Sequence, residues 1–276
     1  MNKGYDNMSK MSVRNSVNDS TTLDDIVEIV GIPINRISSE DVTNTLVKWA
    51  LGQQPHHVVT VNPEFVMIGQ ENKEFLQVLK SASLRIADGI GILWASYLLG
   101  KPITERVTGV DTVRSFTKEA SKHGVRFFFL GAAPGIAELA ADSLRKEYPG
   151  LQIVGTYAGT PKVEDEEEIC ERIKSVHPQV LFVAYGAPIQ DLWIARTAHK
   201  LKIPVAIGVG GTFDFLAGTA IRAPRWMRRS GLEWLFRLIQ EPRRWRRMLR
   251  LPRFVIAVFG SIWTRKNLLK GNRIHG

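Results

Sequence analysis

The sequence of 276 residues is poor in the side chain arrangements that bind metal ions. It has a single cysteine, Cys170, which excludes a disulfide framework and a zinc cluster made of cysteines. No H-E-x-x-H and no G-x-x-x-x-G-K-S/T sequence is present, so zinc proteases of that type and P-loop NTPases are excluded. A D-x-D pair, of the kind that holds a divalent cation beneath a nucleoside diphosphate, is also missing. We therefore expect neither a bound metal nor another cofactor.

Long hydrophobic runs are scarce as well. Residues 1–24 are rich in Asn, Ser and Asp and lack the apolar segment of a secretory signal, so we expect a disordered leader. The longest apolar run near the C-terminus, residues 254–263, has about ten residues and is interrupted by Gly260 and Ser261. A bilayer span needs about 20 apolar residues. We therefore expect no membrane-spanning segment, although part of the chain is able to lie on a membrane surface.

Acidic side chains are almost absent from the end of the chain. Residues 222–276 hold 15 Lys and Arg against two acids, a net charge of +13, whereas the whole chain carries +10. The other residues therefore sum to −3. The same segment holds four of the seven tryptophans, namely Trp226, Trp234, Trp245 and Trp263. We divide the chain into the leader, a near-neutral domain over residues 25–221, and a basic, Trp-rich helical appendage over residues 222–276.

The sequence of the appendage predicts helices on which arginines surround apolar stripes. One stripe, at i, i+3, i+4 and i+7, is Leu232, Leu235, Phe236 and Ile239; after Pro242 a second one has Trp245, Met248 and Leu249. This pattern is typical of a helix that lies on anionic lipid. A nucleic-acid patch, a partner interface and a plain surface are the alternatives. Basic regions that bind nucleic acid rarely place so many large apolar side chains among their arginines, so we expect no nucleic-acid partner. Without a membrane, the stripes are able to pack on a second copy of the chain.

In the domain, short apolar runs rich in β-formers alternate with amphipathic stretches. Strands are expected at residues 58–61, 84–87, 125–130, 180–185 and 205–209, and helices at residues 71–83, 89–99, 110–123 and 136–147. Such alternation predicts a mostly parallel sheet covered by helices on both faces. The expected fold class is therefore α/β, with a Rossmann-like, doubly wound sheet and the basic helical appendage at its C-terminal end.

Polar residues and glycines follow the expected strands, and ligands of open α/β sheets bind beyond the carboxyl ends of the strands. The candidates at these positions are Thr60, Asn62, Glu64, Asp88, Gly89, Gly131–Gly135, Gly186–Gln190, Gly210, Gly211 and Asp214. Each has a structural alternative. Asp88 is able to cap the next helix, Thr60 and Asn62 are common turn residues, and Gln190 and Asp214 are able to satisfy loop backbone. The turn at residues 131–135 is not a G-x-G-x-x-G sequence, which argues against a nicotinamide enzyme.

An ordered set of motifs covers roughly residues 26–253. The motifs are Thr60-Val-Asn-Pro-Glu-Phe-Val66, Ala87-Asp-Gly-Ile-Gly91, Glu105-Arg-Val-Thr-Gly-Val-Asp111, Phe129-Leu-Gly131, Gly186-Ala-Pro-Ile-Gln-Asp-Leu-Trp193, Gly210-Gly-Thr-Phe-Asp-Phe-Leu-Ala-Gly218, Arg222-Ala-Pro224, Gly231-Leu-Glu-Trp-Leu-Phe-Arg237 and Glu241-Pro-Arg243. In this order they resemble the WecG/TagA/CpsF glycosyltransferases of bacterial surface-polysaccharide synthesis. The resemblance implies transfer of a sugar from a UDP-sugar to a sugar on a polyprenyl diphosphate, with inversion, at the cytoplasmic face of the membrane. In the founding activity the sugar is N-acetylmannosamine and the acceptor is N-acetylglucosaminyl-diphospho-undecaprenol.

The resemblance also assigns roles to residues. It implies that Asp88 is the base, that Thr60, Asn62, Arg106 and Gln190 shape the sugar pocket, and that Arg237, Arg244 and Arg247 close over the site and meet the diphosphate. We further expect Gly131 and Asp214 to lie near the nucleotide. For Arg106 the structural alternative is an ion pair with Glu105 or Asp111.

One departure concerns the donor. Many members of the family have P-K-Q-E where this chain has Pro188-Ile189-Gln190-Asp191, which leaves the identity of the donated sugar open. With no D-x-D pair, arginines are the natural partners of a leaving diphosphate, because guanidinium groups pair bidentately with phosphate oxygens. The alternative function is a membrane- or nucleic-acid-binding Rossmann-like protein without transferase activity.

Overall fold

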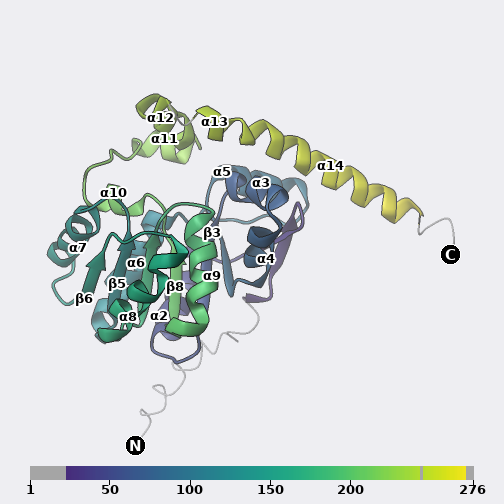
Figure 1. Ribbon diagram of the computed structural model, residues 1–276. Helices are drawn as coiled ribbons and strands as arrows, with labels where there is room; N and C mark the ends of the chain where they lie inside the picture. Colours follow the sequence, from purple (N-terminus) through teal and green to yellow (C-terminus); the bar gives the residue numbers. More distant parts are fainter. Residues whose placement is uncertain (1–22, 243–244, 272–276) are drawn as a thin grey trace, which may run out of the picture.

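A six-stranded parallel sheet forms the centre of the computed structural model, which describes residues 23–242 and 245–271 (Figure 1). The strand order is β4-β3-β8-β7-β5-β6. The strands are β3 (His56–Val61), β4 (Leu84–Ala87), β5 (Arg126–Gly131), β6 (Gln152–Tyr157), β7 (Val180–Ala184) and β8 (Val205–Gly208). All neighbouring pairs are parallel, so every carboxyl end lies at one edge of the sheet. The expected Rossmann-like α/β fold is confirmed.

Helices cover both faces of this sheet. They are α2 (Ser39–Ala50), α3 (Pro63–Glu71), α4 (Lys73–Ser81), α5 (Ile90–Leu98), α6 (Gly109–Ala120), α7 (Ile136–Glu147), α8 (Glu166–Ser175), α9 (Ile189–Leu201) and α10 (Thr212–Leu216), with 3-10 turns at Ser121–His123 and Val163–Asp165. One buried cluster joins the sheet to α2, α6 and α7, and two others join the opposite face to α3, α4 and α5 and to α8 and α9. A small antiparallel hairpin, β1 (Ile26–Ile29) and β2 (Ile32–Asn35), packs in the cluster with α3 and α4.

Alternating side chains of the strands enter different clusters. In β5, Phe127 and Phe129 pack on the side of α6 and α7, whereas Phe128 and Leu130 pack on the side of α8 and α9. Phe182 of β7 contacts Phe127 and Phe129 at ring distances of 5.5 Å. Because both faces are buried, the strands read as continuous apolar runs, which is the pattern that predicted them.

Several parts of the domain differ from the expectation, among them the hairpin of β1 and β2 and the helices α2 and α9, which were not expected. The helix expected over residues 71–83 begins at Lys73, because the Oδ1 atom of Asn72 accepts the N–H of Phe75 at 3.0 Å and caps it. Residues 63–71 form a separate helix, α3, and the strand β6 was also not expected. The Asn72 cap therefore divides what the sequence pattern presents as a single helix.

The appendage consists of α11 (Arg225–Arg229), α12 (Glu233–Gln240), α13 (Trp245–Met248) and α14 (Arg250–Gly271). In Figure 1, α11 and α12 lie above the edge of the sheet where α5 and α10 begin, and α14 runs across α3 and α5. Phe254 and Val258 of α14 are buried in the same cluster as α3 and α5. The division at residue 222 stays a prediction, but α14 packs on the domain. The expected leader lies almost entirely outside the described residues.

No helix in residues 23–242 and 245–271 is long and apolar enough to cross a bilayer.

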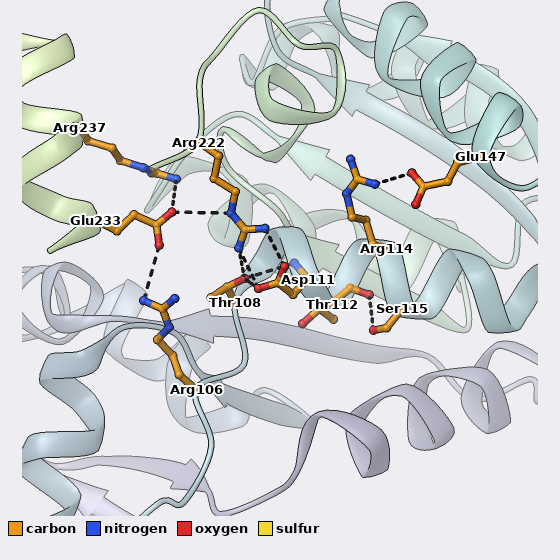
Figure 2. Close-up of polar contacts among 10 residues, drawn as sticks. All are labelled: Arg106, Thr108, Asp111, Thr112, Arg114, Ser115, Glu147, Arg222, Glu233 and Arg237. Atoms are coloured by element: carbon orange, nitrogen blue, oxygen red, sulfur yellow. Dashed lines mark hydrogen bonds and ion pairs between the residues drawn. The ribbon is translucent and has the colours of Figure 1, made fainter. Parts of the chain in front are cut away.

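An ion pair fastens the beginning of the appendage to the domain (Figure 2). The two terminal nitrogens of Arg222 donate to the two carboxylate oxygens of Asp111 at 2.7 and 2.8 Å, and one of them also reaches Thr108 Oγ1 at 3.2 Å. Desolvation raises the pKa of Asp111, but the hydrogen bonds from Arg222 and Thr108 outweigh it, so the pKa is lowered. A bidentate pair of this kind fixes both position and orientation.

We expect Asp111→Asn to loosen the segment that joins α10 to α11. The substitution removes one charge of the bidentate pair, so the free energy of unfolding should fall by about 1 kcal/mol. Limited proteolysis between residues 217 and 224 should become faster. Asp142→Asn is the matched control, because Asp142 pairs with Arg145 on the exposed face of α7. Equal cleavage rates in both variants would contradict the anchoring role of Arg222.

Candidate active site

Asp88 follows β4 directly, at the carboxyl edge of the sheet. Its backbone N–H donates to the carbonyl oxygen of Val61 in β3 at 2.8 Å, and the backbone N–H of Gly109 hydrogen-bonds to its carboxylate. The N-cap of α5 is Gly89, with φ 112°, and it makes no side-chain capping bond. Asp88 therefore does not cap α5, and its carboxylate is held next to the first turn of α6 instead.

The carboxyl group of Asp88 has a pKa close to neutral pH. Burial raises the pKa to about 6. Arg237 lowers this pKa, Glu233 raises it, and Arg106 lowers it. A carboxylate with a pKa near 6 is a stronger base than an ordinary aspartate and is still ionised at pH 7.

Three arginines surround Glu233 (Figure 2), whose charge also acts on the pKa of Asp88. Glu233, at the start of α12, forms ion pairs with Arg106 at 3.5 Å, with Arg222 at 3.9 Å and with Arg237 at 4.0 Å. The three arginines come from the loop between α5 and α6, from the segment before α11, and from α12. The sequence alone assigned no role to Glu233, although it lies within the motif at residues 231–237.

The ion pairs of Glu233 are looser than the anchor formed by Arg222 and Asp111. Their distances of 3.5–4.0 Å exceed hydrogen-bond length, whereas the anchor is at 2.7–2.8 Å. The guanidinium of Arg237 also lies over the ring of Phe215, 4.6 Å from its centroid. A phosphate offers guanidinium groups bidentate contacts, which are stronger than ion pairs at these distances. The cluster is therefore able to receive an anionic ligand.

Three of the expected pocket residues hold the strand ends in place. Asn62 Oδ1 accepts the N–H of Phe65 at 3.0 Å and caps α3, and the hydroxyl of Thr60 lies 3.5 Å from the carbonyl of Gly208. The fully buried Gln190 accepts, through Oε1, the N–H of Gly186 at 3.1 Å and of Gly210 at 2.9 Å. These contacts join the loops after β7 and β8.

Gly131 and Asp214 lie farther from Asp88. Gly131 ends β5, four strands away from β4, which places it about 19 Å along the edge. It has φ 99°, and a Cβ atom there would come within 2.8 Å of the Ala184 backbone, so glycine is required. Asp214 is in the first turn of α10, after β8. Such a spacing suits an extended ligand with one end at Asp88 and the other near β5.

Arg244 and Arg247 were also expected to meet the diphosphate, and only Arg247 lies within the described residues. Arg247 of α13 pairs with Glu64 of α3 at 3.4 Å, close to the Asn62 cap, and Arg250 also pairs with Glu64 at 3.2 Å. Arg244 lies outside the described residues. Within residues 23–242 and 245–271, no group of three His, Cys, Asp or Glu side chains is arranged to hold a metal ion.

Glu233→Gln is expected to lower the pKa of Asp88. Glu233 raises this pKa, so removing its negative charge leaves Arg237 and Arg106 unopposed and favours the ionised carboxylate. The acidic limb of the pH dependence of turnover, expected near pH 6, should shift to lower pH, and the weaker base should reduce the plateau rate. Glu71→Gln is the matched control, because Glu71 pairs with Arg250 and Arg253 on α14. An unshifted limb in Glu233→Gln would contradict the coupling.

Asp88→Asn is expected to stabilise the fold. The pKa of Asp88 is raised from 3.8 to about 6, so its protonated form adds stability at low pH that is lost as the pH rises through 6. At pH 7.5 the neutral amide removes this cost, and the free energy of unfolding should rise by on the order of 1–2 kcal/mol. Urea unfolding at pH 7.5 and at pH 4 measures it. The gain should shrink at pH 4, and a lower stability at pH 7.5 would contradict the burial of an ionised group.

Comparison with known proteins gives one family. The sequence model of the family described as "Glycosyl transferase WecG/TagA/CpsF family" matches residues 27–268. Three relatives share the name N-acetylglucosaminyldiphosphoundecaprenol N-acetyl-beta-D-mannosaminyltransferase. The protein of Bacillus spizizenii strain W23 is 38% identical over 73% of this chain and 77% of its own length. That of Bacillus subtilis strain 168 is 34% identical over 73% and 78%, and that of Staphylococcus aureus strain MW2 is 29% identical over 84% and 91%.

Proposed function

The chain belongs to the WecG/TagA/CpsF family of glycosyltransferases, and we propose that it moves N-acetylmannosamine or a related hexose from a UDP-sugar to a polyprenyl-diphosphate-linked sugar. The names of the three relatives support the acceptor and the donated sugar. The observation that carries the proposal is the base-like carboxylate of Asp88 beside the cluster of Arg106, Arg222 and Arg237. The product enters the synthesis of a cell-surface polymer.

Asp88 takes the proton in this proposal. As the acceptor hydroxyl attacks the anomeric carbon of the donor, its O–H bond breaks and the proton passes to the carboxylate of Asp88. The new glycosidic bond forms on one face of the sugar while the bond to the diphosphate breaks on the other face, so the configuration inverts. UDP leaves with the electron pair. Thr60, on the neighbouring strand β3, and Asn62, which follows that strand and caps α3, bound the sugar next to Asp88 in this proposal.

Arginines stabilise the leaving diphosphate. Arg237 and Arg106 both act on the pKa of Asp88 and pair with Glu233 at 4.0 and 3.5 Å, and in this proposal both contact phosphate oxygens of the donor. Arg247, and Arg244 outside the described residues, belong to the same proposal. Gly131 and Asp214 mark the distant, nucleotide end of the site. A metal ion is not needed for this charge stabilisation, because guanidinium groups supply it.

The appendage brings the enzyme to its lipid-linked acceptor. Residues 222–276 carry the net charge of +13, which favours an anionic membrane surface, and we place the chain on the inner face of the cell membrane, where nucleotide sugars are made. The large exposed side chains of the appendage, Trp226, Trp234, Ile239, Trp245, Leu249, Ile256, Phe259 and Trp263, support contact with lipid.

Turnover tests the proposal directly. A panel of UDP-sugars is offered with a synthetic polyprenyl-diphosphate-N-acetylglucosamine acceptor, and lipid-linked disaccharide is measured. Asp88→Asn should lower kcat by about 10²–10⁴-fold, because it removes a general base. The matched control is Asp142→Asn, because Asp142 lies on the surface of α7. Asp191→Asn would not serve, because Asp191 is fully buried next to His57. Absence of product with every donor, from folded protein with membranes, would contradict the proposed reaction.

Arg237→Ala should lower kcat by about 10²–10³-fold, in proportion to the lost stabilisation of the leaving group. Arg237→Lys should recover part of the rate, because it restores the charge but not the bidentate geometry. Arg172→Ala is the matched control on α8, where the side chain is exposed and pairs with Glu168. A rate unchanged in Arg237→Ala would remove this arginine from the reaction while leaving Asp88 in place.

A further inference from the structure

Helix α5 presents an apolar face to solvent. Its sequence from Ile90 to Leu98 has no charged side chain. Ile92, Ala95 and Ser96 face the core, as expected for a surface helix, yet the outward face is not polar. It carries Ile90, Trp94, Tyr97 and Leu98, which are 44%, 38%, 73% and 36% exposed. Large apolar side chains gathered in this way mark a surface that contacts something other than water.

A second apolar face, on α14, continues this surface. Phe254 and Val258 of α14 turn inward and are buried, whereas Val255, Ile256, Phe259 and Trp263 are exposed. The rings of Trp94 and Phe259 meet edge to face, with centroids 5.8 Å apart. The exposed faces of α5 and α14 are therefore one continuous apolar surface, although α5 belongs to the catalytic domain and α14 to the appendage.

We propose that the outward face of α5 docks on the surface of an anionic bilayer together with α14, so that the catalytic domain itself contacts lipid. This inference rests on the proposed function and adds to it a contact outside residues 222–276. Aromatic side chains such as Trp94 and Tyr97 are favoured at the boundary between lipid and water. A basic side chain is present on the same helix: Arg253 of α14 is exposed.

Charge argues for a bilayer and against a second copy of the chain. Two copies that paired through this surface would bring together two appendages of net charge +13 each, and like charges repel. An anionic bilayer attracts the same charge. Contact between α5 and a bilayer would also position the base, because α5 begins two residues after Asp88. A bilayer that holds α5 holds the base at the depth where the sugar of a lipid-linked acceptor lies.

Fluorescence of a probe on α5 tests this contact in the full-length chain. Cys170 is buried, and burial raises the pKa of its thiol, so a single introduced cysteine takes up the label selectively. Tyr97→Cys, Ile256→Cys and Val163→Cys are labelled with an environment-sensitive nitrobenzoxadiazole probe and mixed with vesicles of equal parts phosphatidylglycerol and phosphatidylcholine. Val163 is the matched control, 66% exposed in the 3-10 turn before α8.

Probes at residues 97 and 256 should both shift to the blue and brighten severalfold with these vesicles, while the probe at 163 stays unchanged. A response at 256 without one at 97 overturns the inference, because the appendage then binds alone. No change in fluorescence at either position overturns the inference together with the proposed membrane association. Turnover of a short, water-soluble acceptor then shows whether the transferase activity stands. A response at 97 that needs no lipid and grows with protein concentration assigns the surface to a second copy and also overturns it.

Activity gives a second, independent measurement. Tyr97→Ser should raise KM severalfold for acceptor embedded in vesicles and leave kcat and KM for a short, water-soluble acceptor unchanged. Leu139→Ser, at a similarly apolar and exposed position on α7, should change neither. Equal changes with both acceptors would overturn the inference, because they would show a defect in the site instead of in membrane contact.

Discussion

The charge balance around Asp88 is the constraint on which the rest of the site depends. A base that works near neutral pH needs a raised pKa, and a leaving diphosphate needs positive charge close by, but positive charge lowers the pKa of the base. Burial and Glu233 act against the arginines, and the result is a pKa of about 6. In the proposed mechanism Glu233 serves both requirements, because it pairs with Arg106 and Arg237 near Asp88 and offsets part of their charge.

The parallel sheet sets the distances in this site. The ends of β3 and β4 are neighbours, so Thr60 and Asn62 lie beside Asp88, whereas Gly131 is four strands away. A ligand that uses the whole edge must be long, with the reacting group at β4 and its other end near β5. Gln190 keeps the intervening loops in position, since one buried oxygen accepts N–H groups from the loops after β7 and β8. A nucleoside diphosphate sugar has this extended form.

The sequence pattern predicted most strands and the residues that follow them, and it missed contacts between residues far apart in the sequence. Alternating apolar runs gave five of the six parallel strands, but β6, which contains Gly155 and ends in partly exposed residues, has no such run. Asn72 was not recognised as a cap. The residues after the strands predicted Asp88 as a candidate, because the parallel arrangement brings strand ends together; its role stays a prediction. The partnership of Asp111 with Arg222 spans 111 positions, and no periodicity reports it. The role of Glu233 depends on the same long-range packing.

In the proposed function, the appendage couples the transfer reaction to the membrane that carries the acceptor. Arg237 lies on α12, Arg247 on α13 and the apolar face that meets α5 on α14, so one continuous segment supplies charge to the site and apolar surface beside it. Arg222 and Asp111 fix one end of this segment, while Phe254 and Val258 fix the other against α3 and α5. The part between these anchors is held to the domain by the ion pairs of Glu233 and Glu64. A surface that orders this part orders Arg237 and Arg247 at the same time. In the proposed mechanism, a donor bound without those arginines lacks stabilisation for its leaving group, so such an arrangement would disfavour its hydrolysis away from the acceptor.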